Sequence, residues 1–363
     1  MFGRSVLYND LLFFFVNYQM IKSIEWLGDA VRFLDQTELP LNEKYVETKN
    51  LAELEDAIVK LKIRGAPLLG IAAAYGVLLG IQPFQFSENE EFLQALERSI
   101  FSISKTRPTA KNLFWALERM KNVVRLNHQD SVTMLFEKLT MEAIAIHNED
   151  RIMCESIGKN GANLIGSSAK ILTHCNTGAL ATGGIGTAQG IITTAHRQGK
   201  KISVYADETR PLLQGARLTA WELMSEGVDV TLITDNMAAW TIKSKKIDLI
   251  ITGADRIAAN GDTANKIGTY NLAILAKEHG IPFYIAAPTT TIDIELADGN
   301  QIPIEERSAI EVVEVSGKRI APENVNIFSP SFDVTPNELI TAIITEKEIL
   351  YPPFFNSIKK VLA

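Results

Sequence analysis

The sequence contains little cysteine. Its 363 residues include only two, Cys154 and Cys175. Two thiols exclude a disulfide-built scaffold and a cysteine zinc site, and they are typical of a protein from a reducing compartment. Because free cysteine is most often a buried and unreactive side chain, composition alone assigns neither residue a function.

Positive charge is scarce as well. The chain has 36 Lys and Arg residues against 43 Asp and Glu, which gives a formal net charge of −7. This balance excludes a broad basic surface, so we predict no nucleic-acid partner. It leaves room for a local basic pocket that binds a small anion. With 46% apolar and 22% charged residues, the composition indicates a folded globular protein and not an extended disordered chain.

Long hydrophobic runs are missing near the N-terminus. The apolar run over residues 11–16 is six residues long, whereas a signal-peptide core needs about 7–15 and a membrane span about 20. Asn9 and Asp10 prevent its extension, and later apolar runs are interrupted by Gly, Pro or charged residues. We interpret residues 1–19 as an extension outside the fold, and we predict a soluble protein of the cytoplasm with no membrane partner.

Several catalytic and cofactor motifs are absent. The five histidines show no HxxxH or HExxH spacing, so we predict no metal site. The sequence has no GxSxG elbow and no GxxxxGKS/T loop. Residues 184–190, with Asp207 about twenty residues later, resemble a loosened dinucleotide fingerprint. Eight residues separate Cys175 from Gly184, whereas a dinucleotide turn follows its strand directly. This spacing disfavours a dinucleotide-dependent dehydrogenase, and we predict no cofactor.

The chain length predicts two domains, and the hydrophobic pattern changes along the chain. Over residues 20–145 apolar residues recur every three or four positions, which is typical of amphipathic helices. We therefore predict a mainly helical N-terminal domain over residues 20–145 and an α/β catalytic domain over residues 146–363. The clearest helices of the first domain are expected over residues 51–62, 87–106 and 111–124.

In the second domain, short apolar runs alternate with helical segments. Strands are predicted over residues 170–174, 201–206, 229–233, 247–252 and 282–287, and helices over residues 186–197, 213–225, 236–243 and 267–279. Repeated strand–helix–strand units with nearly continuous apolar strands indicate a parallel sheet that is covered on both faces. The expected fold is a Rossmann-like, doubly wound α/β sheet, and ligands of such sheets bind beyond the carboxyl ends of the strands.

Polar residues follow the predicted strands at these ends. Asp255 comes soon after the apolar run 249–251, so desolvation is expected to raise its pKa and suit it to proton transfer. Cys175 ends the first strand and enters a glycine-containing loop, where backbone N–H groups near a helix start would lower its pKa. The neighbouring His174 points to the opposite face of the strand, so we interpret it as a core or capping residue. Asp235 is favoured as a helix cap.

Three basic residues lie at helix boundaries. Arg64 precedes a Gly-Ala turn that opens an apolar helix, Arg107 lies at the break between two helices, and Lys266 lies in a polar loop at a predicted helix start. Backbone N–H groups at a helix start bind anions, and a neighbouring arginine or lysine adds charge. Each residue alone is more typical of a solvated surface charge. The three together favour a phosphate site.

Five segments together resemble the S-methyl-5-thioribose-1-phosphate isomerase family of methionine salvage. They are residues 61–67, 104–117, the Cys175 loop, 205–223 and 252–275, and the similarity extends from about residue 20 to 350. The run GADRIAANGDTANKIGTYNLAILAKEHGIPFY is the most specific to the superfamily. That superfamily also includes regulatory subunits of the eukaryotic exchange factor for initiation factor 2 and ribose-1,5-bisphosphate isomerases.

The resemblance implies a sugar-phosphate isomerase that converts an aldose 1-phosphate to a ketose 1-phosphate without a cofactor. It implies Cys175 and Asp255 as the catalytic pair and a homodimeric state. The implied substrate contacts are Arg64, Gly65, Ala66, Arg107, Gln214, Asn265 and Lys266. Residues 183–185 read Gly-Gly-Ile where the family can carry a bulkier sequence, and this bears on binding of the 5-substituent.

Two alternative functions and one question of mechanism remain open. The substrate is 5-methylthioribose 1-phosphate in the favoured hypothesis, and 5-deoxyribose 1-phosphate or ribose 1,5-bisphosphate in the first alternative. A non-catalytic regulatory subunit is the second, and the presence of both Cys175 and Asp255 disfavours it. Within the isomerase hypothesis, proton transfer and hydride shift between C2 and C1 are both compatible with these residues.

Overall fold

The computed structural model describes residues 21–315 and 317–363, so the predicted extension over residues 1–19 lies outside the described residues. The first described elements are three antiparallel strands, in the order β1-β2-β3. They are β1 (Ile24–Trp26), β2 (Val31–Leu34) and β3 (Tyr45–Thr48). The sequence analysis did not predict this sheet, because strands of three or four residues are too short to show a hydrophobic period.

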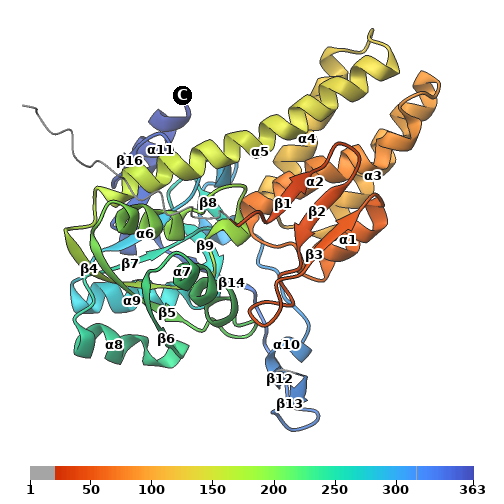
Figure 1. Cartoon of the computed structure of the whole chain (residues 1–363). Helices are drawn as coiled ribbons and strands as arrows, with labels where there is room; N and C mark the ends of the chain where they lie inside the picture. The colour runs from red at the N-terminus through yellow and green to blue at the C-terminus, as the bar shows by residue number, and fades with distance from the viewer. Residues whose placement is uncertain (1–20, 316) are drawn as a thin grey trace, which may run out of the picture.

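Helices make up the rest of this part of the chain (Figure 1). They are α1 (Leu51–Val59), α2 (Ala66–Ile81), α3 (Asn89–Thr106), α4 (Lys111–Leu126) and α5 (Val132–Ala162). The helices predicted over residues 51–62, 87–106 and 111–124 are confirmed with shifts of two or three residues at their ends. Helix α2 contacts α1, α3, α4 and α5 and is apolar on all sides, as expected of a central core helix.

One helical segment, Ala66–Phe84, is long and apolar enough to cross a membrane by length and composition alone. Its most apolar window is 72% buried inside the protein. The neighbouring helices therefore cover the surface that lipid would cover in a membrane span, and the segment is accounted for as the core of the helical part.

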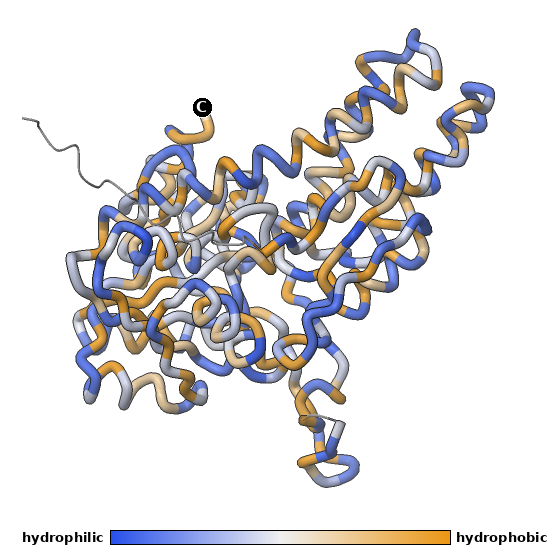
Figure 2. The backbone as a smooth tube through the Cα atoms, viewed as in Figure 1, coloured by the Kyte–Doolittle hydropathy of each residue, from blue (hydrophilic) through white to orange (hydrophobic). Residues whose placement is uncertain are grey.

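Helix α5 joins the helical part to the α/β part. Its 31 residues correspond to a length of about 46 Å at 1.5 Å per residue, and Figure 1 shows it passing from one part to the other. It contacts α2 and α4 near one end and α6 (Ala188–Arg197) near the other. Figure 2 shows hydrophobic and hydrophilic residues alternating along it, as expected of a helix packed on one side. The helix continues through residue 145, where the sequence analysis placed a domain boundary.

Within the described residues, a seven-stranded sheet forms the centre of the α/β part, in the order β16-β15-β10-β7-β4-β5-β6. All neighbouring strands are parallel except β15 and β16. The strands are β4 (Ser168–Thr173), β5 (Lys201–Asp207), β6 (Asp229–Ile233), β7 (Leu249–Thr252), β10 (Phe283–Ala286), β15 (Ala342–Ile344) and β16 (Ile349–Leu350). The five predicted strands correspond to β4, β5, β6, β7 and β10, so the α/β class with a mainly parallel sheet is confirmed.

Helices cover both faces of this sheet. Successive strand residues point to opposite faces: Ile250 packs in a cluster with α8, α9 and α11, whereas Leu249 and Ile251 pack in one with α5, α6 and α7. The helices are α7 (Ala220–Ser225), α8 (Ala238–Lys245), α9 (Thr269–His279) and α11 (Phe354–Leu362). The four predicted helices are confirmed as α6, α7, α8 and α9, and a π-helical turn, Gly215–Thr219, precedes α7.

A second, four-stranded sheet corrects one expectation. Its order is β11-β8-β9-β14, and its strands are β8 (Arg256–Ala258), β9 (Thr263–Lys266), β11 (Ile292–Asp293) and β14 (Phe332–Thr335). Asn265 and Lys266 therefore lie on a strand and not in a loop at a helix start. The hydrophobic pattern did not predict this sheet, because its strands pair with segments far away in the chain, as β9 does with β14. Helix α10 (Ile310–Val313) and the hairpin β12 (Glu314–Val315) and β13 (Lys318–Arg319) project from the body (Figure 1).

Candidate active site

A cavity with an empty volume of about 820 Å³, its open mouth included, lies where the helical part meets the carboxyl ends of β4 and β7. All nine site residues predicted from the sequence line it: Arg64, Gly65, Ala66, Arg107, Cys175, Gln214, Asp255, Asn265 and Lys266. They come from the start of α2, the end of α3, the loops after β4 and β7, the turn before α7, and β9. The tertiary fold therefore brings together residues that are up to about 200 positions apart in the chain.

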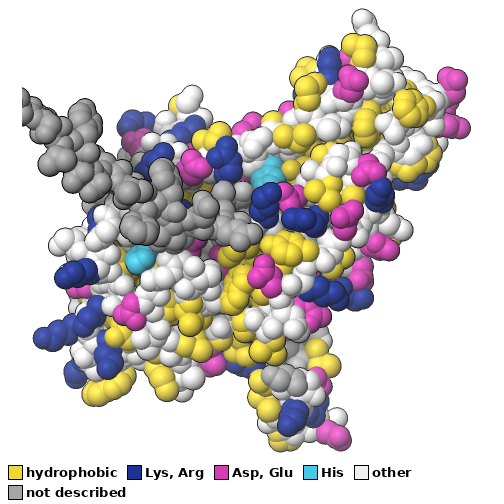
Figure 3. Space-filling model, viewed as in Figure 1, with side chains coloured by type: hydrophobic (Ala, Val, Ile, Leu, Met, Phe, Trp, Pro, Cys, Tyr) yellow, Lys and Arg dark blue, Asp and Glu magenta, His cyan; other side chains and the backbone are white. Residues whose placement is uncertain are grey.

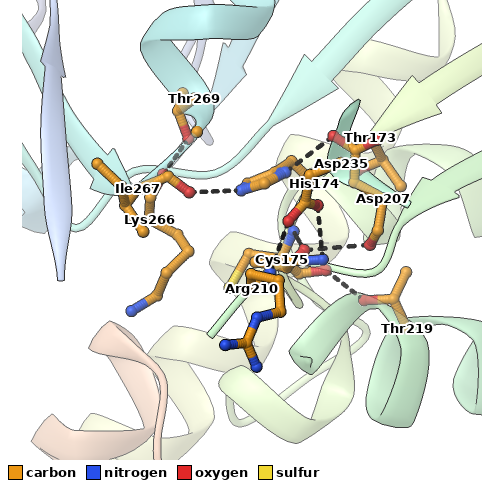
Figure 4. A network of polar contacts seen from close by, with 12 residues as sticks. Thr173, His174, Cys175, Asp207, Arg210, Thr219, Asp235, Lys266, Ile267 and Thr269 are labelled. Atoms are coloured by element: carbon orange, nitrogen blue, oxygen red, sulfur yellow. Dashed lines mark hydrogen bonds and ion pairs between the residues drawn. The ribbon is translucent and has the colours of Figure 1, made fainter. Parts of the chain in front are cut away.

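The Cys175 backbone is held in an unfavourable conformation. Its φ is +60°, a left-handed value that costs a residue with a side chain about 1–2 kcal/mol. Two hydrogen bonds fix it there: the Cys175 N–H donates to Thr209 Oγ1 at 2.8 Å, and the Thr219 hydroxyl donates to the Cys175 carbonyl at 2.5 Å. Figure 4 shows the contact between Thr219 and Cys175. Such strain collects where function requires one side-chain direction.

The charge state of Cys175 differs from the sequence expectation. Burial raises the pKa of the Cys175 thiol, whereas Arg64 and Lys266 lower it and Asp255 raises it further. The prediction of a lowered pKa was wrong, because desolvation outweighs the nearby positive charges. The other cysteine, Cys154, is buried in α5 and does not line the cavity.

Asp255 behaves as expected. Burial raises the pKa of its carboxyl, although Lys266, Arg107 and Arg64 oppose the shift. The Asp255 N–H donates to the carbonyl of Ala264 at 2.9 Å, which ties the segment after β7 to β9. The raised pKa of Asp255 is confirmed, and it favours a carboxyl group that can donate a proton.

The basic residues in the cavity carry unused hydrogen-bond donors. Arg64 is only 8% exposed, and its Nη2 donates to the Asn176 carbonyl at 3.1 Å while Nη1 is buried without a partner. Arg107 donates from Nη2 to Glu305 at 3.2 Å, and its Nε is buried without a partner. Lys266 Nζ lies 4.9 Å from the centre of the Phe332 ring. Since an unpaired buried donor is costly, these groups favour an anionic ligand in the cavity.

The other predicted contacts shape the same space. Gly65 has φ +107°, and a Cβ there would lie 2.5 Å from Ala181 Cα, so the close approach needs glycine. Ala66 begins α2, whose first N–H groups have no intrahelical acceptor. Gln214 Oε1 is buried without a partner, and Asn265 donates to Thr269 Oγ1 at 2.9 Å.

Several cavity residues were missed. Arg307 lines the cavity, donates to Glu305 Oε1 at 3.0 Å and contacts Glu311 at 2.7 Å. Phe332 comes from β14, and Leu212 lies in the turn before α7. The segment around Arg307 forms no long helix or strand, so no periodic signal in the sequence indicated that it reaches the cavity.

A buried carboxyl supports the loop after β4. Glu222 on α7 accepts hydrogen bonds from Asn176 Nδ2 at 2.7 Å and from Gln189 Nε2 at 3.0 Å. Burial raises the pKa of the Glu222 carboxyl to about 7, although Asn176 and Arg64 oppose the shift. Because Asn176 follows Cys175 directly, Glu222 helps to fix the cysteine loop.

His174 lies on the other side of the strand from the cavity. Its ring is buried, with Nδ1 2.9 Å from Asp207 Oδ2, so it forms no pair with the Cys175 side chain and is placed as a core residue. Asp235 was expected to cap the helix that follows it, and it does not. It accepts from the backbone N–H groups of Thr209 at 2.8 Å and Arg210 at 2.7 Å, because the turn after β5 presents these two N–H groups to it.

Comparison with known proteins defines the class. Residues 62–352 match the model of the initiation factor 2 subunit family, and the chain belongs to this family. Among its curated relatives, the methylthioribose-1-phosphate isomerase of Heliobacterium modesticaldum is 55% identical over 93% of this chain and 98% of the relative. The enzyme of that name from Thermotoga maritima is 53% identical over 94% of this chain and 98% of the relative.

Solved structures of similar fold carry two kinds of description. The 5-methylthioribose 1-phosphate isomerase of Pyrococcus horikoshii has a TM-score of 0.89 at 43% identity, over 95% of this chain and 96% of that one. A chain from A. fulgidus described as subunit delta of translation initiation factor eIF-2B has a TM-score of 0.84 at 43% identity, over 94% and 99%. The curated relatives at 51–55% identity confirm the prediction of an enzyme, a sugar-phosphate isomerase.

Proposed function

We propose that the protein converts 5-methylthioribose 1-phosphate to 5-methylthioribulose 1-phosphate in methionine salvage. The relatives of more than half identity carry the name of this activity. The observation that carries the proposal is one cavity lined by a thiol, a carboxyl and basic residues, among them Cys175, Asp255, Arg64, Arg107 and Lys266. The basic residues are suited to hold the phosphate, and the other two are suited to move protons.

The proposed chemistry follows from the substrate. A phosphate on the anomeric carbon prevents ordinary ring opening to a free aldehyde. Asp255 in its protonated form donates a proton to the ring oxygen as the C1–O bond breaks. Cys175 as thiolate removes the C2 proton, and the resulting thiol, whose proton exchanges with solvent, protonates C1. As C1 is protonated, the C2 hydroxyl gives up its proton to Asp255 and its oxygen becomes the ketone carbonyl, which restores the protonated acid.

The pKa shift of Asp255 supports its proposed starting state, whereas that of Cys175 does not. Burial raises the pKa of Asp255, which favours the protonated acid. Burial also raises the pKa of Cys175, so the thiolate is the minor form in the empty cavity. The reactive combination, a protonated Asp255 and an ionised Cys175, is therefore a small fraction of the free protein, and Arg64 and Lys266 are the groups that stabilise the thiolate.

A hydride shift from C2 to C1 is the competing mechanism, with Cys175 in a supporting role. Isomerisation in deuterated water separates the two. Proton transfer through the thiol predicts solvent deuterium at C1 of the product. Product without deuterium would exclude exchange through Cys175 and leave the hydride shift.

The substrate is tested with a panel of sugar 1-phosphates. Leucine and phenylalanine side chains in the cavity, Leu61, Leu69, Leu212 and Phe332, favour an apolar 5-substituent over a second phosphate. We expect the highest kcat/KM for 5-methylthioribose 1-phosphate, then 5-deoxyribose 1-phosphate, and the lowest for ribose 1,5-bisphosphate. A preference for either of the last two would move the assignment to that substrate. No turnover of any of them would favour the regulatory-subunit alternative.

We also propose a two-domain, doubly wound organisation for the chain. From β6 to β15 the parallel strands have the chain order three-two-one-four-five-six, which is the Rossmann order. The domains are proposed over residues 20–145 and 146–363, with α5 crossing between them. Limited proteolysis tests the division: cleavage is expected outside α5, because its backbone is hydrogen-bonded along its length.

The proposed setting is a cytoplasmic homodimer that binds neither nucleic acid nor membrane. On the face shown in Figure 3, Lys and Arg are interspersed with Asp and Glu, and the net charge is −7, which together give little attraction for a polyanion. Light scattering after size exclusion tests the dimer, for which the mass expected is twice 40.1 kDa.

A further inference from the structure

Both ring nitrogens of His174 face hydrogen-bond acceptors. Nδ1 lies 2.9 Å from Asp207 Oδ2, and Nε2 lies 2.8 Å from the carbonyl oxygen of Ile267. A carbonyl oxygen only accepts, so Nε2 must carry a hydrogen, and an ionised Asp207 requires a hydrogen on Nδ1 as well. With Asp207 ionised, the two contacts are satisfied together only by the doubly protonated, positively charged ring.

The surroundings of the ring stabilise that charge. Asp207 at the end of β5, Asp235 after β6 and Asp333 on β14 are the carboxylates that interact with it. Burial raises the pKa of Asp333, and the hydrogen bonds that it accepts from the N–H groups of Gly268 at 2.7 Å and Tyr270 at 3.1 Å oppose this shift. Burial alone would lower the pKa of His174, but the bond to Asp207 and the charges of Asp207 and Asp235 raise it.

The ring connects two parts of the cavity wall. His174 directly precedes Cys175, and Ile267 directly follows Lys266. A Cβ at Gly268 would lie 2.9 Å from His174 Cε1, so the ring also packs closely against the turn before α9. Figure 4 shows His174 between the Asp207 side chain and the Lys266–Ile267 backbone.

We propose that His174 is a permanently protonated positioning residue, whose two N–H donors hold Cys175 and Lys266 at a fixed separation. His174 does not touch the cavity and transfers no proton. Its effect on turnover rests on the proposed function, in which both residues act on one substrate, whereas its protonation state is independent of that function.

The protonation state is tested on the unmodified protein by 15N NMR with labelled histidine. We expect both His174 nitrogens to show attached protons from about pH 6 to pH 9. Loss of either proton in the folded protein within this range would overturn the proposal. So would a change of the His174 signals on adding Zn²⁺ or a chelator, since His174, Asp207 and Asp235 present their polar atoms within 4.8 Å of one another.

Kinetics of two variants test the positioning role, with His279→Gln as the matched control expected to keep wild-type rates. The amide of His174→Gln can donate to one of the two acceptors, and the hydrogen bond to the other is lost. We expect kcat to fall about 100-fold, with a raised KM, because the sub-ångström placement of Cys175 and Lys266 is lost. In Asp207→Asn, His174 no longer faces a carboxylate at Nδ1. We then expect it to lose a proton within the assay range, so that kcat falls with rising pH. A wild-type kcat in folded His174→Gln, with only a lower melting temperature, would overturn the positioning role. An inactive wild-type protein would overturn the proposed function, and the NMR result would still decide the charge of His174.

Discussion

The guanidinium of Arg107 and the carboxylate of Glu305 form an ion pair, with Nη2 3.2 Å from Oε2, although the two residues are 198 positions apart in the chain. Glu305 also accepts from Thr109 Oγ1 at 3.2 Å and from Arg307 at 3.0 Å. A carboxylate of the protein thus occupies one donor of an arginine that we propose for the substrate phosphate.

Arg107→Gln is expected to raise KM about 30-fold with a smaller change in kcat, because a charge-assisted hydrogen bond to phosphate contributes about 2 kcal/mol. The matched variant Glu305→Gln removes the competing negative charge and should lower KM about 2- to 3-fold. Steady-state kinetics measure both. An unchanged KM in Arg107→Gln would remove this residue from the phosphate site.

Cys175→Ser and Asp255→Asn are each expected to reduce kcat at least about 1,000-fold, within the range of general acid–base contributions. The melting temperature and circular dichroism should stay near those of the wild type, since both substitutions keep the size of the side chain. Cys154→Ala is the control, because Cys154 lies outside the cavity, and it should retain turnover. Near-normal turnover in either active-site variant would contradict its assigned role.

The pH dependence of thiol alkylation reports on Cys175 directly. Because the negative charge of Asp255 raises the pKa of this thiol, Asp255→Asn should move the alkylation midpoint to lower pH. Arg64 lowers the same pKa, so Arg64→Met should move the midpoint upward. Rates of iodoacetamide modification measure the shifts, with Cys175→Ser giving the background from Cys154. Shifts of the opposite sign would show that these charges do not act on the thiol.

Glu222 should make the protein less stable as pH rises. Its folded pKa of about 7 lies above the ordinary value of 4.5, so the unfolded chain ionises first. The free energy of unfolding therefore falls between about pH 4.5 and 7, by on the order of 3 kcal/mol. Glu222→Gln should lack this fall, and its amide can donate to Gln189 Oε1, which has no partner. Urea unfolding of both proteins across this range measures the difference, and parallel curves would be the contrary result.

Gly65→Ala should cost both stability and binding. The residue has φ +107°, and an added Cβ would lie 2.5 Å from Ala181 Cα. Gly199 has φ +82° with nothing within 4 Å of an added Cβ, so Gly199→Ala is a control that carries the backbone strain of about 1–2 kcal/mol alone. We expect a larger loss of melting temperature in Gly65→Ala and a raised KM, because Arg64 and the start of α2 must shift. Equal effects of the two substitutions would contradict the close-approach argument.

Local periodicity explains which elements were predicted from sequence. Strand β7 is a run of apolar residues between a helix and a polar loop, and α6 ends near a glycine, so each carries its own signal. The strands β8, β9 and β14 carry no such signal, because their pairing depends on a partner up to about 70 residues away. Arg307 was not predicted either, because the segment around it forms no long helix or strand and carries no periodic signal.

The sequence by itself determined the mainly parallel α/β sheet, the position of Cys175 and Asp255 just after its strands, and the residues that carry the family similarity. These features follow from hydrophobic pattern and motif, which are local in the chain. Only the tertiary structure decided the direction of the Cys175 pKa shift, since it is a balance between burial and the charges of Arg64, Asp255 and Lys266. It also decided the two acceptors of His174. Distances between residues far apart in sequence set both, and no local pattern encodes them.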